Sequence, residues 1–94
     1  MVKVSEINWR KVITTDAFEV GKVSGAEMDD QWKITHINVN LTKTATNELG
    51  FKKPVLGSIT ICLPVEYIQG LGDVITLNTT REGLKGIQEC ELDS

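Results

Sequence analysis

Apolar side chains recur at every second position along much of this chain, which is the periodicity of a strand with one buried face. The alternation is clearest in 33–41, where Ile37, Val39 and Leu41 are separated by polar residues. Segments of this kind follow one another at short intervals, as is typical of a small sandwich or barrel. They predict an all-β fold with strands at 2–4, 11–14, 17–28, 33–41, 56–63, 73–77 and 87–91.

The segment 17–28 departs from regular alternation. Phe18 and Val20 share a face, but the next large apolar residue, Val23, comes three positions later. One additional residue at Gly21 or Lys22 would return Val23 to the buried face, and such an insertion is a β-bulge. Bulged, bent strands allow a small sheet to curl into a barrel. The pattern therefore predicts a bulge here and a strongly bent sheet.

Two short helical turns are predicted from possible capping residues. Thr44 can cap a short helix that runs to residue 49, and Gly50 follows in the position favoured for a left-handed residue. Thr79 and Glu82 have the spacing of a capping box, which indicates a second short turn. A chain with only these turns remains mostly β.

The stretch LPVEYIQGLGDVITL, residues 63–77, predicts a strand end, one helical turn and a new strand. Pro64 lacks an N–H and suits the first position of a helix, so the turn is expected at 65–68. Gly70 and Gly72 allow a reversal, and the next strand is expected to begin at Asp73. The core is predicted to contain Phe18, Val20, Val23, Ile37, Val39, Ile59, Ile61, Ile75 and Leu77.

With 94 residues, the chain is expected to be one domain, with a barrel core at about 3–86 and an acidic tail at about 91–94. The net charge of −3 weighs against nucleic acid as the main partner, because phosphate binding needs a basic surface. Lys52 and Lys53 are the candidate basic patch. The start of the chain has no signal-peptide pattern, and no apolar stretch is long enough for a membrane helix. We expect a cytoplasmic protein without membrane insertion.

Candidate catalytic and metal-binding groups are few. Cys62 and Cys90 lie far apart and form no C-x-x-C pair, so with His36, the single histidine, they do not suggest a zinc site. In a reducing cytoplasm both cysteines should stay thiols, although a disulfide between them is an open alternative. Asp29 and Asp30 lack the spacing of a calcium loop and are interpreted as a solvated hairpin tip. We expect no catalytic residue, cofactor or metal, and therefore no enzyme.

Trp32, on the expected hairpin at 28–32, and Trp9 are the candidate interaction residues. An exposed tryptophan would suit the centre of a protein interface, whereas a tryptophan folded over the barrel mouth would be a plug. The sequence leaves both interpretations open. Ile87, on the predicted closing strand, completes the candidate interface.

Three stretches together resemble the PRC-barrel family: KVITTDAFEVGKVSG at 11–25, ITHINVNL at 34–41 and LPVEYIQGLGDVITL at 63–77. The resemblance rests on Val-Gly-Lys-Val at 20–23, Leu-Pro-Val-Glu-Tyr-Ile at 63–68 and Gly-Asp-Val-Ile at 72–75, and extends over about residues 3–86. It is nearest to the short stand-alone archaeal members. Where many members have a glycine in the first strand turn, this chain has Asn8 and Trp9.

The resemblance implies a small, highly bent antiparallel β-barrel of about six strands with a non-enzymatic role in assembling other macromolecules. Stand-alone archaeal members are associated with cell division, and other relatives with ribosome maturation. We therefore expect a protein-interaction adaptor that binds a protein partner and itself forms a homodimer. The alternative is an RNA-processing or ribosome-associated barrel that uses Lys52 and Lys53.

Overall fold

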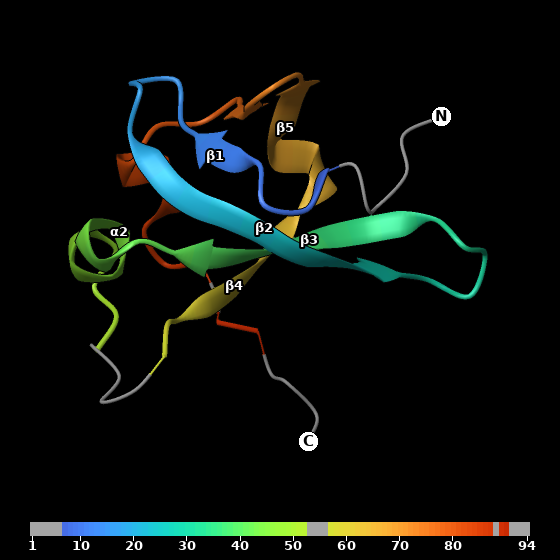
Figure 1. The fold of residues 1–94 in the computed structure, drawn as a ribbon, viewed down its shortest axis with the longest axis horizontal. Helices are drawn as coiled ribbons and strands as arrows, with labels where there is room; N and C mark the ends of the chain where they lie inside the picture. The colour runs from blue at the N-terminus through green and yellow to red at the C-terminus, as the bar shows by residue number, and fades with distance from the viewer. Residues whose placement is uncertain (1–6, 53–56, 88, 91–94) are drawn as a thin grey trace.

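Six strands form one continuous sheet in the computed structural model, which describes residues 7–52, 57–87 and 89–90 (Figure 1). The strand order is β4-β3-β2-β1-β6-β5. The elements are β1 (Lys11–Ile13), β2 (Glu19–Met28), β3 (Ile34–Leu41), the helix α2 (Lys43–Glu48), β4 (Thr60–Pro64), the 3-10 turn η1 (Val65–Tyr67), β5 (Ile68–Leu71), β6 (Ile75–Leu77) and the 3-10 turn η2 (Glu82–Leu84). No helix within these described ranges is long and apolar enough to cross a membrane. The prediction of a mostly β chain with short helical turns is confirmed.

The strand pairing corrects one part of the fold prediction. Neighbouring strands run antiparallel except β1 and β6, which pair in parallel with Val12 opposite Ile75. The sheet is therefore mixed rather than wholly antiparallel. The two parallel strands are separated in the sequence by β2 to β5. Strands β4 and β5 end the hydrogen-bonded order, so pairing between the described residues leaves the sheet open.

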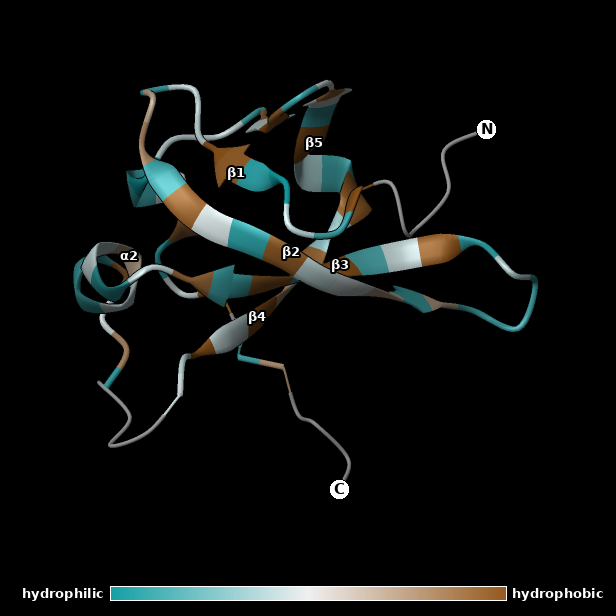
Figure 2. Cartoon of the chain, viewed as in Figure 1, coloured by the Kyte–Doolittle hydropathy of each residue, from teal (hydrophilic) through white to brown (hydrophobic). Residues whose placement is uncertain are grey.

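Apolar side chains of the strands meet on one face of the bent sheet and form the core. Hydrophobic and hydrophilic residues alternate along β2 and β3 in Figure 2. Of the nine predicted core residues all except Phe18 are buried, at no more than 9% exposure. Phe18 is half-buried and packs against the core, with the Arg81 guanidinium 5.4 Å from its ring centroid. Alternation thus identified the buried face correctly.

The bulge predicted in β2 exists, but at a slightly different position. Val12 lies opposite Gly21 and Ile13 opposite Glu19, so Val20 is the additional residue facing β1. A second shift, against β3, skips Ser24. The alternation shows that the phase breaks between Val20 and Val23, but only the pairing with β1 shows which residue is additional. The prediction of Gly21 or Lys22 was therefore wrong by one position.

Gly21 allows the backbones of β2 and β3 to approach closely. A Cβ atom built on Gly21 would lie 1.9 Å from the carbonyl oxygen of Asn40. No heavy atom can occupy that position, and the obstacle is backbone that a rotamer change cannot move. Glycine is needed here because of space, since a side chain would separate β2 from β3.

We predict that Gly21→Ala lowers the free energy of unfolding by about 3 kcal/mol, the upper range for overpacking a dense interior. Gly25→Ala is the matched control in the same strand, because its new methyl would meet only the Asn38 side-chain nitrogen, at 3.4 Å. The control should cost less than about 1 kcal/mol. Urea unfolding followed by circular dichroism measures both, and equal losses would contradict the steric explanation.

The capping residues of both short helical turns differ from the prediction. Thr42, not Thr44, caps α2: its Oγ1 accepts a hydrogen bond from the Ala45 N–H at 3.0 Å. Ala45 in the first turn of the helix is buried, and the cap lies two residues earlier than predicted. Gly50 follows with φ 83°, as predicted. At η2 the predicted capping box is wrong, because the Thr80 hydroxyl accepts from the Gly83 N–H.

Segment 63–77 contains one strand that the sequence did not predict. The turn η1 covers residues 65–67, and Pro64 is the last residue of β4, opposite His36. The next four residues form β5, in which Gly70 pairs with Thr76 instead of forming the reversal. Strand β6 accordingly begins at Ile75 rather than Asp73. β5 was missed because Gln69 and Gly70 interrupt its apolar alternation.

The two predicted terminal strands, at 2–4 and 87–91, can be compared with the structure only in part. Segment 2–4 lies outside the described residues, and so does Glu91. Residue 88 also lies outside the described residues. Among the described residues of this segment, Glu89 forms an isolated bridge with Ile61, and the Cys90 N–H donates to the Thr60 carbonyl. Ile87 is not the start of a strand as predicted, because its N–H donates to the Leu84 carbonyl and closes the η2 turn.

Asp16 joins the turn after β1 to the start of η2. Its carboxylate accepts hydrogen bonds from the Thr14 hydroxyl and, at 3.2 Å, from the Arg81 N–H. The Thr14 hydrogen bond is the main reason that the pKa of Asp16 lies below its ordinary value of 3.8. The charged carboxylate therefore stabilises the folded chain.

We predict that Asp16→Asn lowers the thermal midpoint near neutral pH, and that this difference vanishes in acid. A carboxylate with a lowered folded pKa contributes its full stabilisation above its unfolded pKa and loses it as the pH falls through the folded pKa. Thermal melts at a series of pH values below about pH 7 measure the difference. Asp30→Asn, at the exposed hairpin tip, is the control; a pH-independent Asp16 effect would contradict the prediction.

Candidate functional site

Both tryptophans are largely exposed, which argues against the plug interpretation. Trp32 is 84% exposed and Trp9 is 70% exposed. Large exposed aromatic side chains are enriched at the energetic centres of protein interfaces, so both remain candidate interaction residues.

The hairpin that carries Trp32 is ordered by one aspartate. Asp29 Oδ1 accepts hydrogen bonds from the N–H groups of Gln31, at 2.8 Å, and Lys33, at 3.0 Å. The Trp32 N–H donates to the Asp29 carbonyl at 3.1 Å, and Trp32 has φ 64°. Asp29 was interpreted only as solvated surface, although an aspartate at the start of a tight turn favours such bonds. The β2–β3 hairpin extends away from the other strands (Figure 1), and Trp32 lies in its connection.

Trp9 lies in the turn that leads into β1. It has φ 70°, a backbone region that glycine adopts most readily, and its N–H donates to the Val23 carbonyl at 2.7 Å. The neighbouring Arg10 guanidinium donates to the Gly72 carbonyl. The turn is therefore anchored to β2 and to the β5–β6 reversal while the indole stays exposed.

The other two groups of candidate residues receive less support. Ile87 is half-buried and packs against the core, so it offers little apolar surface to a partner. Lys52 is exposed, but Lys53 lies outside the described residues, so the basic patch cannot be assessed as a pair.

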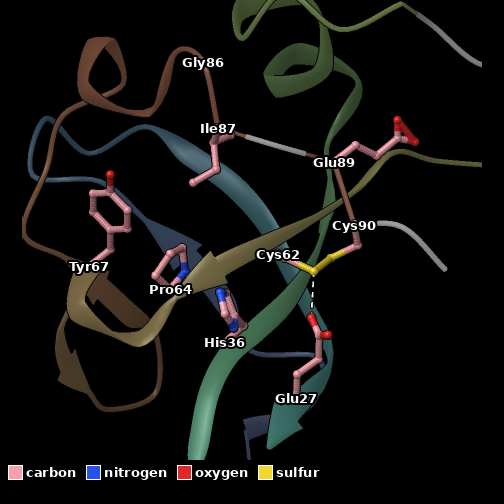
Figure 3. A pocket seen from close by; sticks show the side chains of 9 residues that line it. All are labelled: Glu27, His36, Cys62, Pro64, Tyr67, Gly86, Ile87, Glu89 and Cys90. Carbon is pink, nitrogen blue, oxygen red and sulfur yellow. Dashed lines mark hydrogen bonds between the residues drawn. A yellow bond between two sulfur atoms is a disulfide. The ribbon is translucent and has the colours of Figure 1, made fainter. Parts of the chain in front are cut away.

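An open cleft of about 700 Å³ lies on the outer face of the sheet (Figure 3). It is formed where β2, β3 and β4 meet the segment after η2. Its lining includes Glu27 from β2, His36 from β3 and Cys62 from β4, with Cys90 from the C-terminal segment. The strand alternation that buries Ile37 and Leu63 turns these polar groups outward.

Cys62 and Cys90 form a disulfide in this cleft. The Glu89 bridge to Ile61 and the Cys90 hydrogen bond to Thr60 place the C-terminal segment beside β4, with the two cysteine Cα atoms 4.9 Å apart. The expectation that both cysteines remain thiols is therefore corrected. The sequence left the disulfide open because residues separated by 28 positions reveal their proximity only in the fold.

Glu27 and His36 lie opposite each other across β2 and β3. Glu27 Oε2 is 2.7 Å from Cys62 Sγ (Figure 3), and His36 Nδ1 is 2.9 Å from the Thr35 hydroxyl. A disulfide sulfur carries no proton, so the Glu27 contact becomes a true hydrogen bond only when Cys62 is a thiol. The sequence showed no acid near His36, whereas the strand pairing places one there.

No protein-family model matches this chain, and a search of curated proteins finds no relative. The proposals below therefore depend on the geometry of the exposed tryptophans and of the cleft.

Proposed function

We propose that this protein is a non-enzymatic interaction module that self-associates as a symmetric dimer and acts as an adaptor in a larger assembly. The supporting observation is the 84% exposure of Trp32 on an ordered hairpin. Burying an exposed indole against a partner is strongly favourable, because the large apolar ring loses its contact with water.

The backbone at Trp32 and Trp9 adds to this argument. A non-glycine residue in the left-handed region costs roughly 1–3 kcal/mol and persists where neighbouring contacts hold it, often at functional positions. At Trp32 those contacts come from Asp29, and at Trp9 from Val23. Both positive-φ tryptophans are also largely exposed, so the strained backbone and the candidate interface coincide at these two residues.

The sheet edges offer a second route to self-association. Unpaired strand edges tend to pair with another chain unless they are protected. The Glu89–Cys90 segment bonds to β4, whereas β5 ends the strand order on the other side and exposes 46% of Leu71. Among the described strands, β5 is therefore the edge that the proposal favours for pairing. Two-fold pairing is the commonest assembly for a single chain.

The same proposal includes the resemblance to the PRC-barrel family, with a small, highly bent barrel, a cytoplasmic location and a place in an archaeal cell-division or other macromolecular assembly. The bulges at Val20 and Ser24 support it, because bulged strands allow a small sheet to bend. RNA or ribosome association through Lys52 and Lys53 is the competing proposal.

We predict that Trp32→Ala weakens the dimer at least about thirtyfold in Kd, the loss of roughly 2 kcal/mol that marks the threshold of an interface hot spot. Gln31→Ala, an exposed polar change on the same hairpin, should leave the Kd unchanged. Trp9→Ala tests the second candidate anchor. Sedimentation equilibrium of the wild type and the three variants measures the association.

A monomeric wild type at about 100 μM would contradict self-association outright. A dimer that both tryptophan variants retain with unchanged Kd would contradict the anchor assignment and leave the β5 edge as the contact. RNA binding that weakens steeply with added salt would instead favour the ribosome-associated alternative.

A further inference from the structure

The cleft holds three potential metal ligands that come from three distant parts of the chain. Cys62 Sγ, Cys90 Sγ and a carboxylate oxygen of Glu27 all lie within 4.8 Å of one another. Glu27 is exposed, Cys62 half-buried and Cys90 buried, so the group spans the wall of the cleft from surface to interior. Two sulfurs and a carboxylate at this spacing are a donor set that the proposed interaction function does not use.

The nature of these donors selects the ion. Thiolate sulfur favours Zn²⁺ over hard cations such as Mg²⁺ and Ca²⁺, and zinc also accepts carboxylate oxygen. Three protein ligands with a fourth position open to water is a common zinc arrangement. His36 lines the same cleft, so an imidazole also borders the open side (Figure 3).

The disulfide prevents metal binding as long as it is intact. Metal ligation requires thiolates, and both sulfurs here are covalently joined and uncharged. We propose that this cluster is a redox-gated zinc site: the oxidised chain holds the Cys62–Cys90 disulfide, and the reduced chain binds Zn²⁺ through Cys62, Cys90 and Glu27.

The exchange balances with a cellular thiol as the reductant. The Cys62–Cys90 bond takes up two electrons and two protons and yields two thiols, while two reductant thiols join in a disulfide. Zn²⁺ then displaces both thiol protons and forms two Zn–S bonds and one Zn–O bond with Glu27. Reoxidation reverses the sequence and releases the ion.

The local structure allows this rearrangement. Tetrahedral zinc with bonds of roughly 2.3 Å needs its two sulfurs about 3.8 Å apart, more than a disulfide bond permits. The backbone of Cys62 is held in β4, and the backbone of Cys90 is held by its hydrogen bond to Thr60. Each sulfur can still move by rotation about its own Cα–Cβ bond without a shift of the backbone. Zinc would thus replace the disulfide as the link that closes the loop between the cysteines.

The carboxylate of Glu27 lies beside the two sulfurs. Its Oε2 is 2.7 Å from Cys62 Sγ, although an oxidised sulfur offers it no proton. The glutamate is exposed, so its side chain can turn by the small amount needed to bind an ion that both thiolates hold. Glu89 also lines the cleft but does not belong to the cluster, which makes it a matched control.

The test compares reduced and oxidised protein in anaerobic titrations with Zn²⁺ alone. A phosphine serves as the reductant, ending as the phosphine oxide with oxygen from water, so that no added thiol competes for the ion. We expect one Zn²⁺ per reduced chain and none per oxidised chain, measured by equilibrium dialysis. Co²⁺ in place of zinc should show a sulfur-to-cobalt charge-transfer band, which identifies thiolate ligands directly.

Glu27→Gln should weaken zinc binding to the reduced chain at least about tenfold, the loss that even an outer partner of a metal ligand causes. Glu89→Gln should leave the affinity unchanged. Because Glu27→Gln retains both cysteines and the disulfide, it avoids the loss of the covalent link that Cys62→Ser would cause. No binding by the reduced wild type, equal binding by the oxidised chain, or equal losses in both glutamine variants would overturn the proposal.

Discussion

The close approach of the β2 and β3 backbones at Gly21 is the constraint on which the rest of this structure depends. β2 pairs with β1 on one side and β3 on the other, and it is bulged at Val20 against the first and at Ser24 against the second. The bulge at Val20 shifts the alternation, so that Val20 and Val23 both reach the core despite their odd spacing. A side chain at Gly21 would separate the strands that organise the sheet.

Because one face of the bent sheet forms the core, the functional groups lie on the outer face and at the loops. The long β2–β3 hairpin carries Trp32 away from the core at its tip, and nearer the sheet it carries Glu27 beside the cysteines. Two surfaces with different chemistry therefore share one pair of strands. The apolar indole suits a protein partner, whereas the sulfurs and the carboxylate suit a metal ion.

The C-terminal segment is cross-linked to the sheet and also lines the cleft. Its described residues, Glu89 and Cys90, contact β4 through an isolated bridge, a hydrogen bond and the disulfide from Cys90 to Cys62. The disulfide is the covalent restraint that keeps these two residues beside the sheet. A metal held by the same two sulfurs would preserve that restraint under reducing conditions, when the disulfide is lost.

The sequence by itself determined the strands with clear alternation and most of the core, because the two-residue periodicity of residues such as Ile37 and Val39 is local. It also indicated the bulge in β2 and the left-handed Gly50. Only the tertiary structure decided the parallel pairing of β1 with β6, the exposure of Trp9 and Trp32, and the meeting of Glu27 with the two cysteines. These features depend on which distant segments become neighbours, and periodicity along one strand carries no information about its neighbours.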